Sequence, residues 1–250
     1  MNYNMLFLYF IGHLLGDYYL QSNTIAKDKV CHLKGLLLHC FIYTLIMIAV
    51  ILPIYSHLLL LASLFIALTH FLFDWIKFSM VKYGINHKKE GRPLTHYVLD
   101  QIFHIAIIVF TSMFIAHASR GLNYYPVISE LCYYFGLSLH LLFAWILAIL
   151  VVLRPTSITI KIVLATIHPK EEEPEDSHPS TGMMIGHLER LIILLLLCVG
   201  QYASIGLVLT AKSVARYNKI SNDKEFAEYY LIGTLLSTLV SIVTFLVLLS

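Results

Sequence analysis

The stretch HLLLLASLFIALTHFLFDWIKFSM, residues 57–80, decides the class of this protein. It is longer than the about 20 mainly apolar residues that an α-helix needs to cross the hydrocarbon core of a bilayer. The whole sequence follows the same pattern, with 58% apolar and 13% charged residues, whereas soluble domains have about 45–50% and about 25%. We therefore predict an all-α fold, a polytopic bundle of about seven transmembrane helices.

Working outward from this stretch, seven segments are apolar and long enough to span a membrane: 3–21, 34–53, 57–82, 95–117, 134–153, 182–209 and 226–249. The segment 118–133 contains Gly121 and Pro126 and has mixed polarity, so we expect a connection outside the membrane. The segment 156–167 is too short to span, and we expect it to lie on the membrane interface or against the bundle.

A charged segment divides the chain. Residues 170–180 read KEEEPEDSHPS, a composition that disfavours a packed core and is typical of a solvated linker. The sequence thus predicts three parts, namely a five-helix membrane domain at 1–153, an interfacial segment and acidic linker at 154–181, and a C-terminal helix pair at 182–250.

Basic residues predict the orientation in the membrane. They gather in the connections after the first and third helices: Lys27, Lys29, Lys34, Lys82, Lys88, Lys89 and Arg92. The opposite connections hold only Arg120. Because short basic loops stay in the cytoplasm, we expect residues 22–33 and 83–94 to face it, in the inner (plasma) membrane of a bacterium.

Ionisable side chains recur inside the predicted helices. They form three pairs spaced four residues apart: His13 with Asp17, His70 with Asp74, and Asp100 with His104. Residues four apart share one face of a helix. The order His-then-Asp reverses in the helix that runs the other way, so the pairs fall at matching depth. Such groups cost about 2.5–3.5 kcal/mol each inside a bilayer and usually mark function.

Together with His39, these pairs predict one shared metal site with seven candidate ligands: His13, Asp17, His39, His70, Asp74, Asp100 and His104. Imidazole and carboxylate groups suit a divalent transition metal. We expect zinc, with iron or manganese also compatible, as one or two ions. Polar packing between helices and a proton or ion pathway are the alternatives that the sequence leaves open.

These residues carry a resemblance. The run HLLGDYYLQ (13–21), with Ala26, Lys29 and His39, then HFLFDWIK (70–77) and DQIFH (100–104), resembles a bacterial inner-membrane family catalogued as a domain of unknown function. The resemblance extends to GHLERLIILLLLCVGQYASIGLVLTAKSVARY (186–217) and EYYLIGTLLS (228–237). It implies no biochemistry. The His/Asp pattern is also similar to that of bacterial membrane-bound metal-dependent hydrolases, which implies metal-dependent hydrolysis.

The function expected from these residues is metal-dependent hydrolysis of a lipid or lipid-linked phosphoester near the cytoplasmic face. Asp74, Asp100 and Lys77 are the candidate catalytic residues, with Lys77 as a phosphate partner. Membrane lipid is the expected partner and nucleic acid is not, while a homo-oligomer or a second membrane protein stays open. The alternatives are a transporter or channel for protons or divalent metal, and a scaffold or sensor with a structural metal.

The predicted C-terminal helices carry polar residues of their own. Lys212 and Arg216 lie four residues apart and face one way. We interpret them as snorkelling residues of a helix that leaves the membrane, or as a basic lip that binds anionic headgroups or a substrate phosphate. Glu189 and Arg190 are neighbours in the sequence, and an internal ion pair that holds the helix pair to the bundle is an equal alternative interpretation of them.

Overall fold

The computed structural model describes residues 3–54, 56–83, 93–118, 126–136, 138–167 and 179–250. Within these ranges the chain is helical and contains no strand, which confirms the all-α prediction. Five helices in the described residues are long and apolar enough to cross a membrane: His57–Lys82, Leu94–Ala118, Leu139–Ile167, Thr181–Cys198 and Lys224–Leu248. Leu33–Ala49 and Tyr202–Val214 are shorter apolar helices. The fold is therefore that of a helical membrane protein.

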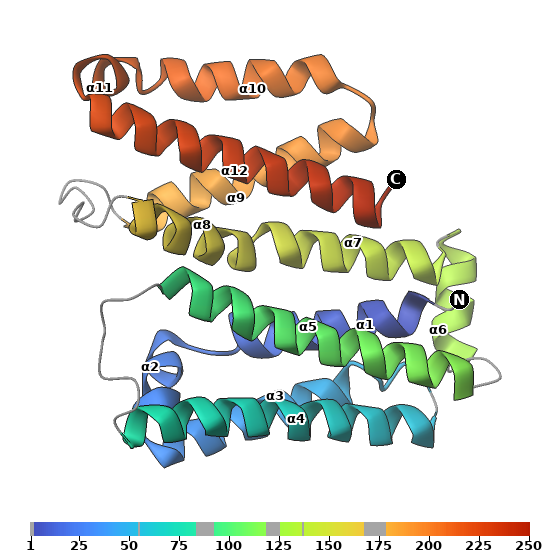
Figure 1. Ribbon diagram of the computed structural model, residues 1–250. Coiled ribbons are helices and arrows are strands. Elements are labelled where there is room, and N and C mark those ends of the chain that lie inside the picture. The colour runs from blue at the N-terminus through green and yellow to red at the C-terminus, as the bar shows by residue number, and fades with distance from the viewer. Residues whose placement is uncertain (1–2, 55, 84–92, 119–125, 137, 168–178) are drawn as a thin grey trace. The chain divides into compact units, whose positions relative to one another are not determined.

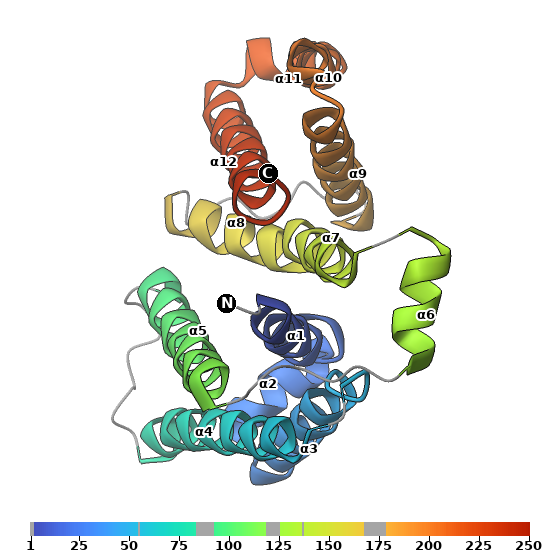
Figure 2. The same cartoon turned by 90° about the vertical axis from the view of Figure 1, so that its right-hand side faces the viewer.

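The chain forms two compact units, Met1–Leu147 and Ala148–Ser250 (Figure 1). The first unit contains α1 (Tyr3–Leu14), the π-helix η1 (Leu15–Tyr19), α2 (Asn23–Cys31), α3 (Leu33–Ala49), α4 (His57–Lys82), α5 (Pro93–Ala118), α6 (Pro126–Tyr134) and the start of α7 (Leu139–Val152). Helix α1 contacts α3 and α5, and α4 contacts the same two helices (Figure 2). These four helices thus form a closed ring, and α2 packs on α3 and α4.

Helices of the first unit depart from the predicted segments at their ends. The segment 3–21 becomes α1 followed by a π-helix, and α3 ends before Pro53. The connection 22–33 contains α2, whose N-terminus is capped by Ser22 Oγ accepting a hydrogen bond from the backbone N–H of Ile25 at 3.2 Å. Helix α6 forms within the predicted connection 118–133.

The second unit begins within α7 and continues into α8 (Arg154–Ile167), so the predicted interfacial segment 156–167 is helical and packs against α9 and α12. Pro155 has no N–H to give the carbonyl of Val151. The Thr156 hydroxyl donates to that oxygen instead, at 2.7 Å. This local replacement explains how the chain stays helical on both sides of a proline.

A turn divides the predicted spanning segment 182–209 into two helices, α9 (Pro179–Cys198) and α10 (Tyr202–Val214). Gly200 takes a φ of 70°, and the N–H of Gln201 bonds to Leu196 O at 2.8 Å, which closes the end of α9. The chain folds back so that α10 contacts α9. It then continues through α11 (Tyr217–Asn222) into α12 (Lys224–Leu248), which packs on α9 and α8.

Glu189 and Lys212 form a buried ion pair in the second unit. Glu189 is 4% exposed, and Lys212 Nζ lies 2.5 Å from its Oε2 and donates to Thr234 Oγ1 at 3.1 Å. The ion-pair partner shown for Glu189 is thus Lys212 of α10. Arg190 donates to the carbonyl of Val152, the last residue of α7, and to that of Leu153.

Several predicted features lie outside the described residues. They are the linker residues 168–178, the basic residues Lys88, Lys89 and Arg92, and Arg120. The predicted orientation in the membrane and the three-part division at 153 and 181 stay predictions.

Candidate metal centre

The ring of α1, α3, α4 and α5 brings four side chains to one point. They are Asp17 from η1, His39 from α3, and His70 and Asp74 from α4. His39 Nε2 lies 3.1 Å from His70 Nε2, 3.3 Å from Asp17 Oδ1 and 3.4 Å from Asp74 Oδ2. His70 Nε2 lies 3.5 Å from Asp17 Oδ1 and 3.4 Å from Asp74 Oδ2. We refer to these four atoms as the tetrahedral set.

The distances between the two imidazole nitrogens, and from them to the two carboxylate oxygens, match those between the ligands of a metal site. Nitrogen and oxygen ligands lie about 2.0–2.2 Å from Zn²⁺, so ligands at the corners of a regular tetrahedron are about 3.3 Å apart. The five distances given above run from 3.1 to 3.5 Å. A cation of this size would thus reach the two imidazole nitrogens together with either carboxylate oxygen.

Hydrogen bonds alone leave lone pairs facing each other in this set. Lys29 Nζ donates to Asp74 Oδ2 at 3.2 Å and lies 3.3 Å from His39 Nε2. If Lys29 donates to His39 Nε2, that nitrogen carries no proton to share with Asp17 or Asp74. His70 Nε2 has at most one proton for three neighbours. Buried lone pairs in contact are costly, and a cation among them removes that cost.

The other predicted ligands surround the tetrahedral set. His13 Nδ1 lies 3.9 Å from Asp17 Oδ2 and 3.2 Å from the Tyr43 hydroxyl, and its Nε2 lies 3.3 Å from Gln101 Oε1. Both ring nitrogens of His13 thus have close neutral hydrogen-bond partners, and His13 remains within reach of a metal group with Asp17 and His70. His104 packs beside His70, with ring centroids 4.4 Å apart.

The described residues contain three groups whose donor atoms could hold a metal ion: His13, Asp17 and His70; His39, His70 and Asp74; and Asp74, Asp100 and His104. All seven sequence-predicted ligands belong to these groups, so the structure brings every one of them into one connected cluster. Their role as ligands stays a prediction.

Two lysines complete the cluster, and the sequence prediction of the site included only one. Lys77 contacts Asp74 Oδ1 and donates to Asp100 Oδ1 at 2.7 Å. Lys29 reaches Asp74 from α2 and also donates to Gln21 Oε1 at 3.3 Å. The charge of Lys29 predicts only that it lies in a cytoplasmic connection. Its place in the resemblance motif, after HLLGDYYLQ, is the sequence signal that points to the site.

The π-helix positions Asp17. Such a turn is rare and often lies at functional sites, and here it carries the side chain of Asp17 toward His39 and His70. Gly16, in the same turn, lies against Tyr43. The Tyr43 ring in turn stacks on the His70 ring with centroids 3.8 Å apart.

Gly16→Ala is expected to weaken the metal centre without removing a ligand. The new Cβ would lie 2.5 Å from Tyr43 Cδ2, so the Tyr43 ring must move and the His70 ring stacked on it must move too. We expect a loss of metal affinity of about 10-fold, as for other changes that disturb ligand orientation. Isothermal titration with Zn²⁺ measures it. Gly206→Ala in α10 is the matched control, since nothing lies within 4 Å of its added Cβ. Unchanged affinity in Gly16→Ala would contradict this account.

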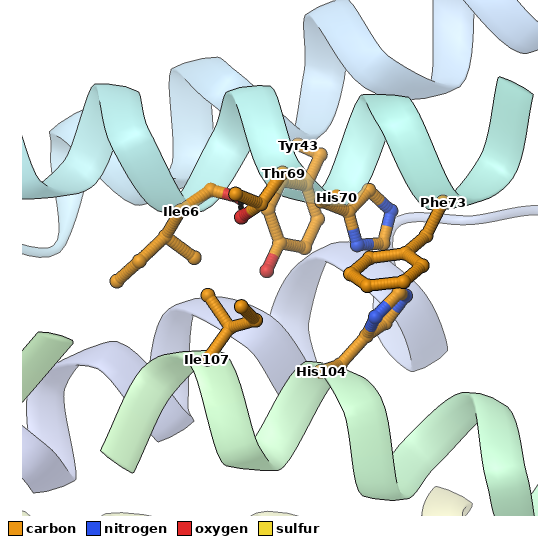
Figure 3. Close-up of a pocket in the computed structure, with 7 residues that line it drawn as sticks. All are labelled: Tyr43, Ile66, Thr69, His70, Phe73, His104 and Ile107. Atoms are coloured by element: carbon orange, nitrogen blue, oxygen red, sulfur yellow. Dashed lines mark hydrogen bonds between the residues drawn. The ribbon is translucent and has the colours of Figure 1, made fainter. Parts of the chain in front are cut away.

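A small pocket of about 10 Å³ adjoins the histidines (Figure 3). Figure 3 shows His70 from α4 and His104 from α5 approaching each other beside it, with the Phe73 ring next to His104. Ile66 and Ile107 lie on the opposite side of the pocket from Phe73. Its volume suits about one water molecule, so it offers space for a small reactant and not for a whole lipid.

Comparison with known protein families identifies one that contains the residues of this cluster. Residues 5–132 match the family described as "Protein of unknown function (DUF3307)", which is more than half of the chain and includes all seven predicted ligands. The chain belongs to this family. The motifs at 186–217 and 228–237 lie outside the matched residues. No curated protein and no solved structure matches the chain.

Proposed function

We propose that this DUF3307 protein is a metal-dependent hydrolase that cleaves a lipid or lipid-linked phosphoester at the cytoplasmic side of the inner membrane. The observation that carries the proposal is the tetrahedral set, because its two imidazole nitrogens lie at the spacing of zinc ligands from each other and from both carboxylate oxygens. Iron and manganese accept the same donors. A divalent cation held there would polarise a phosphoryl oxygen and promote the ionisation of water.

The charges of the cluster favour an anionic substrate. Three carboxylates, those of Asp17, Asp74 and Asp100, stand beside two ammonium groups, those of Lys29 and Lys77. With neutral imidazoles the cluster carries one net negative charge, and a divalent cation would change it to one net positive charge. A phosphoester is thus attracted only when the metal is present.

The exposed members of the cluster lie at one side of it. His39, His70 and Asp74 are buried, whereas the side chains of Lys77 and Asp100 are 41% and 24% exposed. Both lie toward the ends of α4 and α5 that the connection 83–92 joins, and the basic residues predict that this connection faces the cytoplasm. A phosphate group would therefore meet Lys77 first, and Asp100, beside it, is the candidate general base.

A transporter for protons or divalent metal is the second candidate. Ser63 in α4 and both Thr111 and Ser112 in α5 are buried. They lie seven to eight residues from His70 and His104, about 10 Å further from Lys77 along the helices. A transit path would need polar groups at this depth. Ile66, Ile108 and Ile115 lie within about one helical turn of these polar residues and are also buried. These apolar side chains favour a ring of helices that is closed to water on the side away from Lys77.

Reconstitution into phospholipid vesicles tests both candidates. We expect Zn²⁺-dependent release of the headgroup phosphoester from a phosphatidyl lipid, without Zn²⁺ or proton flux. Asp100→Asn should lower turnover at least about 100-fold, as for the loss of a general base. His140→Ala, far along the chain from the cluster, should leave turnover unchanged. Flux that disappears in Asp74→Asn, with no hydrolysis of phosphatidyl or polyprenyl phosphate substrates, would favour the transporter.

A further inference from the structure

The cluster contains a second cation position beside the tetrahedral set. Asp74, Asp100 and His104 form one of the three groups whose donor atoms could hold a metal, and Asp74 also belongs to the tetrahedral set. His104 Nε2 is buried, makes no hydrogen bond in the described part of the chain, and lies 3.6 Å from Asp100 Oδ1. In a two-ion site, a bridging carboxylate such as Asp74 holds the ions about 3.5–4 Å apart.

Lys77 already occupies this second position. Its Nζ contacts Asp74 Oδ1 and donates to Asp100 Oδ1 at 2.7 Å, so it bonds to two of the three carboxylate and imidazole groups that a second ion would need. Its charge satisfies the same carboxylates that a divalent ion would neutralise. A metal ion and an ammonium group cannot share this space.

We infer that the centre binds one divalent ion, at the tetrahedral set, and that the ammonium group of Lys77 takes the place of a second ion. This inference rests on the metal centre of the proposed function, and it states how many ions that centre binds. A two-ion site holds the attacking and leaving oxygens of a phosphoester with two metals. Here a bound metal would stabilise one side, and Lys77, which is 41% exposed, is placed to donate to a phosphoryl oxygen on the other.

Lys29 provides the matched control. Its Nζ contacts Asp74 Oδ2 and His39 Nε2, which are both atoms of the tetrahedral set. Lys29 therefore competes with the first ion and not with a second one. Its removal should tighten binding of a single ion and leave the number of ions unchanged.

Metal counting tests the inference. The purified full-length protein in detergent is stripped with a chelator, saturated with Zn²⁺, passed over a desalting column and analysed for zinc per chain. We expect one ion in the wild type, in Lys77→Arg and in Lys29→Met, and two in Lys77→Met. The second ion should disappear again in Lys77→Met combined with His104→Ala. Size-exclusion elution checks that each variant is folded.

Two ions in the wild type, or one in folded Lys77→Met, would overturn the inference while leaving the metal centre in place. No ion in the wild type would instead refute the metal centre, and the proposed function with it. Lys77→Gln, which can still donate a hydrogen bond between the two carboxylates, replaces Lys77→Met if that variant does not fold. Two ions are expected there as well, and one would count against Lys77 as the excluding group.

Discussion

Replacing His70 with alanine is expected to lower the affinity for zinc at least about 100-fold, because a ligand contributes at least as much as the groups that orient it. His70 Nε2 lies within 3.5 Å of donor atoms of Asp17, His39 and Asp74, so the variant removes a central ligand of the tetrahedral set. Asp74→Asn should act in the same direction, since an amide oxygen carries no charge to offset the ion. Isothermal titration of the chelator-treated protein in detergent measures both variants.

His140→Ala is the control for His70→Ala. His140 also lies in the first unit, where its Nδ1 is 3.1 Å from Asn4 Oδ1 and its ring stacks on Phe7, outside the cluster. We expect wild-type affinity in this variant. Equal affinity in His70→Ala, Asp74→Asn and His140→Ala would mean that the histidines and aspartates pack the helices together without a metal.

The spacing of residues along regular helices predicted much of the site. His70 and Asp74 lie four residues apart in α4, and their donor atoms are 3.4 Å from each other. Matching depths in antiparallel helices also predicted that His104 would reach His70, and their rings are adjacent. Both predictions depend only on α-helical geometry, which the long apolar segments ensured.

Features that depend on irregular backbone could not be predicted in this way. The spacing of His13 and Asp17 assumed an α-helix, but Asp17 lies in a π-helix and its carboxylate turns toward His39 and His70 instead. The approach of Lys29 depends on α2, a short helix inside a connection interpreted only by its charge. Neither the π turn nor the packing of α2 leaves a periodic signal in the sequence.

The division of the predicted segment 182–209 into two helices at Gly200 also left no clear signal in the sequence. A glycine inside a helix costs only about 1 kcal/mol relative to alanine, so the apolar run 182–209 was compatible with one continuous helix. The structure uses the positive φ of Gly200 to end α9 and reverse the chain. This reversal brings Lys212 back toward Glu189. Glu189 and Arg190, as adjacent residues of a helix, do not face each other, so the partner of Glu189 comes from another helix.

The pair formed by Glu189 and Lys212 leads to a strong and asymmetric expectation for stability. Lys212→Met should lower the free energy of unfolding by about 3–5 kcal/mol, the usual cost of leaving one buried charge without its partner. Glu189→Leu should cost less, because the Lys212 side chain is 23% exposed and can turn toward water, whereas Glu189 is 4% exposed.

The double variant Glu189→Leu with Lys212→Met separates the ion pair from simple packing. Replacing both partners removes the unpaired charge, and apolar side chains suit the interior of this unit, so most of the stability lost in Lys212→Met should return. Thermal unfolding of the protein in detergent, followed by helical circular dichroism, ranks the four proteins. We expect the wild type and the double variant to melt close together, Glu189→Leu lower, and Lys212→Met lowest. A double variant that melts below both single variants would show that the two side chains stabilise the unit separately, through packing, and not as a buried pair.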